Sequence, residues 1–197
     1  MLDFKHAYYL ENERVRLSPL KLEHLESLQQ PAGQKSIWTY FLEKGHGSKQ
    51  FKKYIEMALA NRSAAKEYPF VIFDKIKNKY AGMTRLYDWN EELRNLKIGH
   101  TWIGKDFQGT GVNKNCKYLL FEFAFEHLKA VRIGFGVHAE NIRSLRALHR
   151  IGVKKEGILR DFLPEINGSG RKDLILLSIL KDEWFQTIKE DLLQQIK

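Results

Sequence analysis

Cysteine is nearly absent from this chain, since Cys116 is the only one among 197 residues. One thiol cannot form an internal disulfide framework, and it excludes a zinc site built from several cysteines. Long apolar runs are missing too, because none approaches the ~20 residues that a membrane span requires. The opening residues 1–17 are mixed and polar, unlike a signal peptide. We therefore expect a cytoplasmic protein with no metal and no membrane partner.

Linkers are also lacking. No internal repeat, low-complexity tract or stretch rich in proline, glycine and serine divides the sequence. A length of 197 residues suits one domain with a sizeable core, and a hydrophobic content of 43% is typical of a folded protein. We expect a single domain over residues 1–197.

The charge is strongly positive, with a net value of +9. This favours an anionic partner such as nucleic acid, an anionic membrane surface or a phosphate-rich cofactor, although a solvated surface would look the same. The lysines and arginines form no run of five or more, so a nucleic-acid-binding tail is not expected.

The hydrophobic pattern alternates between strand and helix periods. It predicts an α+β protein with a largely antiparallel sheet and one strand–loop–helix–strand unit at its centre. A turn over 74–78 predicts an antiparallel hairpin, and Asn167–Gly170 is expected to join the last two strands. The expected strands are 14–18, 69–74, 79–87, 96–103, 131–138, 153–162 and 173–180; the expected helices include Leu22–Leu28, Phe51–Leu59, Val112–Leu128, a segment capped by Asn141 and ending before Gly152, and a tail over 182–195.

The segment QGTGVNK, residues 108–114, lies where a strand-like run passes into a helix-like run. A helix N-terminus offers unpaired N–H groups and partial positive charge, and glycines allow close approach to an anion. A diphosphate is the natural guest, and Lys105, Lys114 and Lys117 could add charge. A glycine turn that binds nothing remains the alternative.

Two common phosphate motifs do not fit. From Gly104, the sequence GKDFQGTG has threonine where a P-loop requires lysine. From Gly109, the sixth position is Lys114 and not the glycine of a dinucleotide fingerprint. GFGVHA at 134–139 places its last small residue ahead of the helix cap expected at Asn141, so its glycines are interpreted as strand residues.

Four segments, taken in order, resemble the Gcn5-related N-acetyltransferase (GNAT) family, in particular its ribosomal-protein alanine/serine N-acetyltransferase branch. They are NERVRLSPLKLEHLESL, KYAGMTRLYDW, WIGKDFQGTGVNK and GVHAENIRSLRALHRIGVKKEGILR. The third resembles the family's pyrophosphate loop, [RQ]-x-x-G-x-[GA], and the last its Asn-x-x-Ser segment. Each motif alone is weakly specific, but the ordered set covers nearly the whole chain.

The resemblance implies a mixed, mostly antiparallel sheet of six or seven strands with helices on both faces. Strands 96–103 and 131–138 would splay apart around the pantetheine arm of acetyl-CoA, the expected co-substrate. A backbone N–H on the first of these strands would stabilise the oxyanion. The implied cofactor-binding residues are Trp102, Ile103, Gln108, Gly109, Thr110, Gly111, Val112, Asn113, Lys114 and Asn141.

Two positions depart from the family pattern. Asn113 replaces the small residue that closes the loop motif, although its backbone N–H can still donate. Lys97 stands where the family often has an acidic residue, two positions before Gly99. A chain that lacks this acid must use another base or catalyse poorly.

The resemblance makes Ser144 a candidate acid for the leaving thiolate, while a first-turn serine bonded to backbone is the bland alternative. His100 is the candidate base, because a histidine titrates near neutrality. His138, Glu140, Asp88 and a water relay are the other possibilities. Asn141 could cap a helix, bind pantetheine, or both. Arg143, Arg146 and Arg150 form a basic stripe that is either a solvated face or a phosphate contact, and Cys116 is expected in the core.

The predicted function is transfer of an acetyl group from acetyl-CoA to a primary amine, by direct attack in a ternary complex. The acceptor would be a protein N-terminus or a small amine, and a positive enzyme disfavours cationic aminoglycosides. A non-catalytic CoA-binding protein or a basic nucleic-acid-binding protein is the alternative. Dimers are common among the proteins that this chain resembles, so the resemblance allows a homodimer. The sequence itself contains no signal specific for one.

Overall fold

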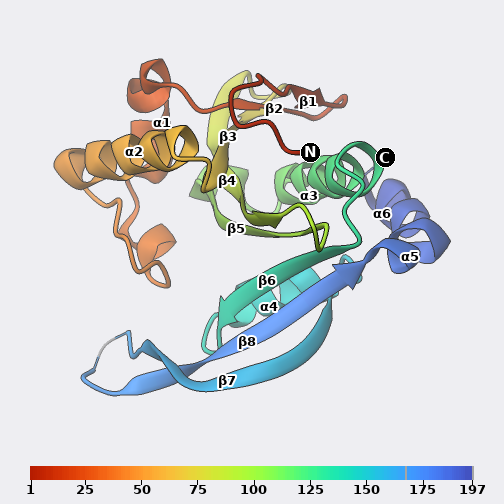
Figure 1. The fold of residues 1–197 in the computed structure, drawn as a ribbon. Helices are drawn as coiled ribbons and strands as arrows, with labels where there is room; N and C mark the ends of the chain where they lie inside the picture. Colours follow the sequence, from red (N-terminus) through yellow and green to blue (C-terminus); the bar gives the residue numbers. More distant parts are fainter. Residues whose placement is uncertain (167, 197) are drawn as a thin grey trace.

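A computed structural model describes residues 1–166 and 168–196. Its centre is one eight-stranded sheet in the order β1-β2-β3-β4-β5-β6-β8-β7 (Figure 1). All neighbours pair antiparallel except β5 and β6, which are parallel. The strands are β1 (Leu10–Glu11), β2 (Val15–Pro19), β3 (Glu67–Asp74), β4 (Lys79–Asn90), β5 (Asn95–Ile103), β6 (Arg132–His138), β7 (Lys154–Pro164) and β8 (Arg171–Leu180).

Helices cover both faces of the sheet (Figure 1). α1 (Leu25–Ala32) and α2 (Ser48–Ser63) lie on one face, joined by a segment that contains the short helix Lys35–Trp38. α3 (Val112–Glu122) lies on the other and continues through one π turn, Phe123–His127. α4 (Ile142–His149) follows β6, and the chain ends in α5 (Lys181–Glu183), a π turn over Trp184–Ile188 and α6 (Lys189–Ile196). No helix in the described ranges is long and apolar enough to cross a membrane.

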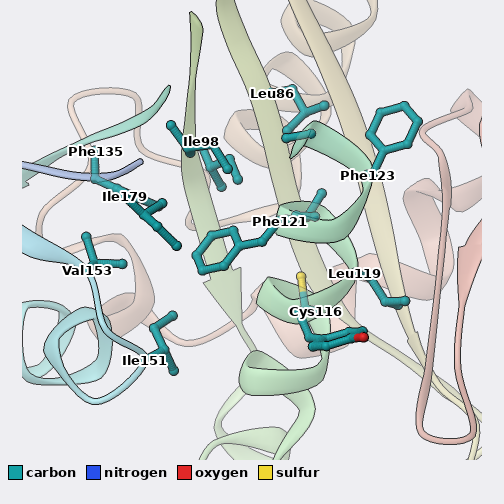
Figure 2. Close-up of a cluster of buried hydrophobic side chains, with 14 of the residues drawn as sticks. Leu86, Ile98, Cys116, Leu119, Phe121, Phe123, Phe135, Ile151, Val153 and Ile179 are labelled. Atoms are coloured by element: carbon teal, nitrogen blue, oxygen red, sulfur yellow. The ribbon is translucent and has the colours of Figure 1, made fainter. Parts of the chain in front are cut away.

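Two apolar cores follow from the alternation of side chains along the strands. The larger core joins α3, α4 and α6 to one face of the sheet. Figure 2 shows part of this core, with Cys116 among the apolar side chains of α3. The smaller core joins α1 and α2 to the other face, through Val71, Met83 and Trp102. Phe70 and Ile72 flank Val71 and reach the larger core, as a strand covered on both faces requires.

A bulge at His100 reverses the alternation of β5. Arg85 pairs with Gly99 but Met83 pairs with Trp102, so β5 carries one extra residue. His100 has φ +48, in the left-handed region that a non-glycine residue rarely adopts. As a result Ile98 before the bulge and Ile103 after it both reach the larger core.

The expected fold is confirmed, including the antiparallel β3–β4 hairpin and the burial of Cys116. The sheet has one strand more than the largest expected number, because the two-residue β1 pairs with β2. Such a short edge segment has too little sequence to show a period. The expected turn over 167–170 includes Asn167, which lies outside the described residues.

Candidate active site

The parallel strands β5 and β6 separate after only three paired positions. Their ladder consists of Asn95–Arg132, Leu96–Ile133 and Lys97–Gly134. Beyond it, residues 98–103 of β5 and 135–138 of β6 are not paired with each other; we call this region the β5–β6 divergence. Each strand stays bound to its outer neighbour, β4 or β8. The expected splay of the central strands is therefore present.

The register of β5 determines which backbone groups face the divergence. Gly104 N donates to Ala81 O at 2.8 Å, which makes this a hydrogen-bonded pair of the β4–β5 ladder. By the alternation of an antiparallel ladder, Trp102 N–H belongs to β4, whereas Ile103 N–H and Thr101 N–H are directed away from it. Ile103 O likewise accepts from Gln108 Nε2 at 2.8 Å rather than from β4. The expected oxyanion donor at Trp102 does not fit this register, because its N–H is used by β4. The expected donor at Ile103 fits, and the N–H of Thr101 is a further candidate.

The glycine loop ends at the start of α3. Gly109 has φ +76 and Gly111 has φ +87, so both occupy conformations that other residues rarely adopt. A Cβ added at Gly109 would meet nothing within 4 Å, and one at Gly111 would meet only Asn115 Nδ2, at 3.8 Å. Gly111 is the N-cap of α3 and makes no side-chain cap, so the first N–H groups of this helix are left for another acceptor.

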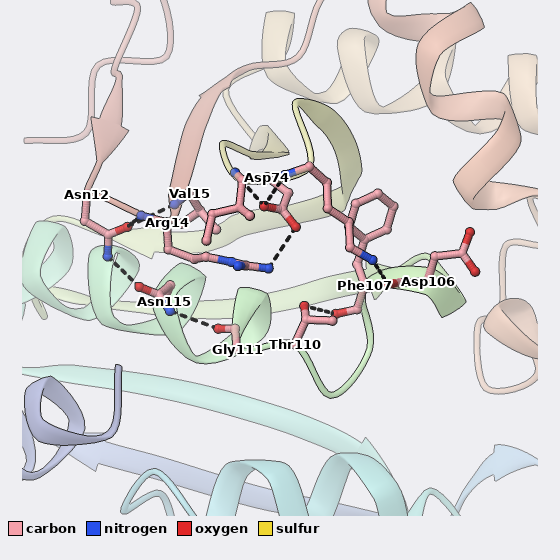
Figure 3. A network of polar contacts seen from close by, with 11 residues as sticks. Asn12, Arg14, Val15, Asp74, Asp106, Phe107, Thr110, Gly111 and Asn115 are labelled. Carbon is pink, nitrogen blue, oxygen red and sulfur yellow. Dashed lines mark hydrogen bonds and ion pairs between the residues drawn. The ribbon is translucent and has the colours of Figure 1, made fainter. Parts of the chain in front are cut away.

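Hydrogen bonds from behind hold the loop in place (Figure 3). Asn115 Nδ2 donates to Gly111 O at 3.1 Å, and Asn115 Oδ1 accepts from Asn12 Nδ2 at 2.8 Å. Thr110 Oγ1 donates to Phe107 O at 2.7 Å. These bonds fix the shape of the loop. On the side of Glu13, Arg14, Ile76, Gln195 and Ile196, away from the β5–β6 divergence, a hollow of about 360 Å³ opens beside Thr110 and Gly111.

The basic residues near the loop have different environments. Lys105 is exposed and Lys114 is half-buried, so neither amine is sealed away from solvent next to the loop. Lys117 is buried and donates to Thr101 Oγ1 at 3.0 Å, so the expectation that it adds charge to the loop is wrong. Arg143 of α4 reaches the loop instead, where Nη1 donates to Gln108 Oε1 at 2.8 Å. Of the expected basic stripe, Arg146 and Arg150 remain exposed.

The start of α4 positions the Asn-x-x-Ser residues. Asn141 caps the helix, because its side-chain oxygen accepts from Ser144 N at 3.2 Å. Ser144 is half-buried, and its hydroxyl makes no hydrogen bond within residues 1–166 and 168–196. The bland alternative, a hydroxyl bonded to nearby backbone, therefore does not describe this serine.

His100 lies on the α2 face of the sheet, among aromatic and charged groups. Its ring centroid is 5.5 Å from that of Tyr87 and 6.5 Å from that of Phe41. Nε2 lies 3.9 Å from Glu67 Oε1, and that carboxylate also binds buried Arg85 at 2.7 Å. Burial, followed by repulsion from Arg85, lowers the pKa of His100 to about 4, so the imidazole is neutral at pH 7.

The other expected bases are occupied by protein partners. His138 is buried and its Nδ1 accepts from Glu140 N at 3.2 Å. Glu140 itself pairs with Lys172 at 3.2 Å. The carboxylate of Asp88 on β4 forms an ion pair with Lys97 at 3.0 Å. Lys97 is the lysine that departs from the family pattern. Among the described residues, no hydrogen bond or ring contact joins His100 to Ser144.

Two sets of residues were missed by reasoning from the sequence. Tyr40 and Phe41 link the separated strands, because Phe41 packs on His100 and Tyr40 on His138 at a centroid distance of 5.3 Å. Tyr40 Oη also donates to Glu140 O at 2.9 Å. The second set is the buried ion pair of Glu67 and Arg85. Neither set carries a motif, and each contact spans a long sequence separation.

Comparison with known proteins agrees with this geometry. Residues 14–154 match the family model described as an acetyltransferase (GNAT) domain. YdaF of Bacillus subtilis, named as a ribosomal N-acetyltransferase, is 36% identical over 103 residues, which cover 52% of this chain and 55% of YdaF. The match thus spans about half the length of that relative. The N-acetyltransferase p20 of Bacillus licheniformis is 25% identical over 177 residues, covering 89% of this chain and 97% of p20.

Solved structures share the whole fold. An acetyltransferase from T. thermophilus has a TM-score of 0.86 and 28% identity, covering 100% of both chains. Mycobacterium smegmatis RimJ, solved in complex with CoA-disulfide, has a TM-score of 0.78 at 22% identity, covering 96% of this chain and 93% of RimJ, and shows the fold alone. The diverging strands, the glycine loop and the family match lead to one assignment: this chain belongs to the GNAT acetyltransferase domain family.

Proposed function

We propose that residues 1–197 form a single N-acetyltransferase domain. It moves an acetyl group from acetyl-CoA to a primary amine by direct attack in a ternary complex. The observation that supports this most is the β5–β6 divergence together with the glycine loop that follows β5. A Cβ added at Gly109 would meet no atom within 4 Å, and one at Gly111 would meet only Asn115. Such a loop at a helix N-terminus suits a diphosphate.

The loop residues Gln108, Gly109, Thr110, Gly111, Val112, Asn113 and Lys114 would hold the diphosphate, chiefly through backbone N–H groups. Ile103 N–H, on the side of β5 away from β4, would meet the pantetheine arm or the acyl oxygen. Asn141 would act on the cofactor only indirectly, since its side chain caps α4. Arg143 lies near enough to the loop, through Gln108, to add positive charge to a bound phosphate.

Acetyl-CoA supplies an activated acyl carbon in a thioester. The new C–N bond forms as the C–S bond breaks, so the amine must lose a proton and the thiolate benefits from gaining one. Ser144 is the proposed donor to the thiolate, because its hydroxyl has no partner in the described chain. Backbone N–H groups of Thr101 and Ile103 would stabilise the oxyanion without reorganisation.

His100 is the proposed proton acceptor for the amine. Its imidazole is neutral at pH 7 and therefore able to accept, but a pKa of about 4 makes it a weak base. Water relay from the amine to solvent fits the same geometry. The family often has an acidic residue at the position of Lys97, so the proton acceptor is the part of the proposed site that differs from the family pattern.

The proposed acceptor is the N-terminal amine of a protein. This rests on the names of the relatives, since YdaF is named as a ribosomal N-acetyltransferase and a Vibrio cholerae structure as a ribosomal-protein-serine acetyltransferase. Tyr40 and Phe41, which contact His138 and His100 on the two separated strands, would contact such an acceptor. A homodimer stays a prediction.

Calorimetric binding of acetyl-CoA at moderate and high salt tests the cofactor, with pyrophosphate as a control for charge alone. We expect binding that exceeds the control and persists in high salt. Release of free thiol with peptides that begin with serine or alanine tests transfer, and the same peptides with a blocked N-terminus are the control. Binding equal to that of pyrophosphate, or equal thiol release with blocked peptides, would contradict the proposal.

A further inference from the structure

Lys117 is a lysine in the protein interior. It lies on α3, and its side chain points at β5, where Nζ donates to Thr101 Oγ1 at 3.0 Å. Thr101 Oγ1 is in turn 2.8 Å from Thr84 Oγ1 on β4. Lys117 is only 4% exposed and Thr84 is fully buried, so this chain of polar groups is sealed from water on the α3 side.

No acid compensates this lysine. Within residues 1–166 and 168–196, none of the ion pairs includes Lys117. Burial of a lysine without a carboxylate partner is costly in free energy, whether the amine stays charged or gives up its proton. Burial disfavours the charged form of this amine, so a lysine kept at such a site suggests that a negative charge visits its neighbourhood and favours protonation.

The place where that charge would arise is close by. Thr101 belongs to the unpaired half of β5, and its N–H is directed to the β5–β6 divergence by the ladder register. Thr101 therefore links the lysine on one face of the sheet to the backbone that borders the divergence. We propose that Lys117 is a positioning residue for acetyl transfer, which acts through Thr101 to place positive charge beside the developing oxyanion and the departing thiolate. This inference rests on the proposed function of the same site.

The charge balance of the site is consistent with this role. Burial lowers the pKa of Lys117, so an anion in the divergence would favour its charged form. By linkage, the lysine would favour the ionised form of that anion to the same extent. The groups that face Lys117 from β5 and β4 are hydroxyls, Thr101 and Thr84. On its own helix the Cys116 thiol stays neutral, because burial raises its pKa to about 11.

The experiment measures the ionisation of the coenzyme A thiol while it is bound to the full-length protein. Thiolate absorbance is followed against pH, with desulfo-CoA as the blank, after calorimetry has shown saturation. Lys117→Met removes the charge and keeps the length of the side chain. Thr101→Val removes the hydroxyl that carries the contact, and Lys155→Met on exposed β7 removes one positive charge elsewhere as the control.

We expect Lys117→Met to raise the pKa of the bound thiol by on the order of one unit or more, a tenfold change in its ionised fraction at a fixed pH. Thr101→Val should shift it in the same direction by less, and Lys155→Met should not shift it. The melting temperature of Lys117→Met should stay equal or rise, since a buried amine without an acidic partner is removed.

An unchanged thiol pKa in Lys117→Met that still binds CoA would overturn the inference and leave the proposed function standing. A lowered melting temperature with unchanged thiol ionisation would identify a purely structural lysine and overturn it as well. If Lys117→Met does not fold, an unchanged thiol pKa in Thr101→Val would overturn the inference. Failure of CoA to bind the unsubstituted protein would overturn the proposed function and this inference together.

Discussion

Arg143 Nη1 donates to Gln108 Oε1 across 2.8 Å, and this bond joins the first turn of α4 to the glycine loop. Gln108 continues the connection, because its Nε2 donates to Ile103 O at the end of β5. One glutamine thus links the two segments that follow the separated strands. The side-chain oxygen and nitrogen of Gln108 are therefore both hydrogen-bonded, and they fix the position of the loop beside the proposed cofactor site.

Replacement of Arg143 by alanine should therefore weaken acetyl-CoA binding. A hydrogen bond to a charged group contributes ~1.5–3 kcal/mol, so we expect the Kd to rise about tenfold or somewhat more at low salt. The difference should shrink at high salt, where exposed charges are screened. Calorimetry at two salt concentrations measures both effects. Arg160→Ala on exposed β7 is the control for net charge, and an unchanged Kd for Arg143→Ala would contradict a role at the loop.

Gly109 offers a matched pair of substitutions. Aspartate and asparagine have the same shape and both tolerate left-handed backbone, and a Cβ at this position meets nothing within 4 Å. We expect Gly109→Asn and Gly109→Asp to fold with similar melting temperatures. Only aspartate places a negative charge against the diphosphate, so its Kd for acetyl-CoA should be at least ~10-fold higher than that of asparagine. Equal affinities would show that no anion binds here.

Ser144→Ala should separate turnover from binding. The helix cap uses the backbone N–H of Ser144 and not its hydroxyl, so the stability of α4 should not change. If the hydroxyl donates to the leaving thiolate, kcat should fall by ~10²-fold or more while the Kd for acetyl-CoA stays within about twofold. Steady-state kinetics and calorimetry on the same preparation test this. Equal losses in kcat and affinity would instead assign Ser144 to cofactor binding.

His100 should make the protein less stable in acid. Its pKa is about 4 in the folded state against the usual 6.5 of a histidine, so the unfolded chain binds more protons between these values. Stability therefore rises with pH through this window and falls as pH drops from 6.5 towards 4, by up to about 3 kcal/mol.

The matched variant for this prediction is His100→Asn, because asparagine accepts the positive φ at this position. Denaturant unfolding between about pH 4 and 7 should show a flatter stability curve for the variant. Burial also lowers the pKa of His24, so the difference between the two proteins is the quantity to compare. Parallel curves would show that His100 titrates normally.

The parts of this fold that the sequence could predict are those with a clear period or a local signal. The buried run of β3, the helical stripe of α3 and the Asn141 cap were predictable because neighbours along the chain decide them. The glycine loop was predictable for the same reason, since left-handed backbone at Gly109 and Gly111 requires glycine.

Features that depend on packing between distant segments could not be predicted. Gly99 in the middle of β5 is a sign of a bulge, but the bulge at His100, which decides which face Thr101 takes, also depends on pairing with β4. Lys117 lies three residues from Lys114 on the same helix, so a helical projection alone placed both near the loop. The contact with β5 buries Lys117, whereas Lys114 stays partly exposed. Glu67, which approaches His100, is 33 residues away along the chain and carries no motif.

With only three paired positions, the β5–β6 ladder is a weak point in the hydrogen bonding of the sheet. On one side lie β1 to β5 and on the other β6 to β8. In the described residues, the backbone hydrogen bonds between them come from this short ladder and from Val131 N to Arg94 O just before it. A pantetheine arm in the divergence would act as a partial extra strand that stiffens the seam. Amide protons of residues 99–103 and 135–138 should then exchange with solvent more slowly in the complex, and thermal unfolding should become more cooperative.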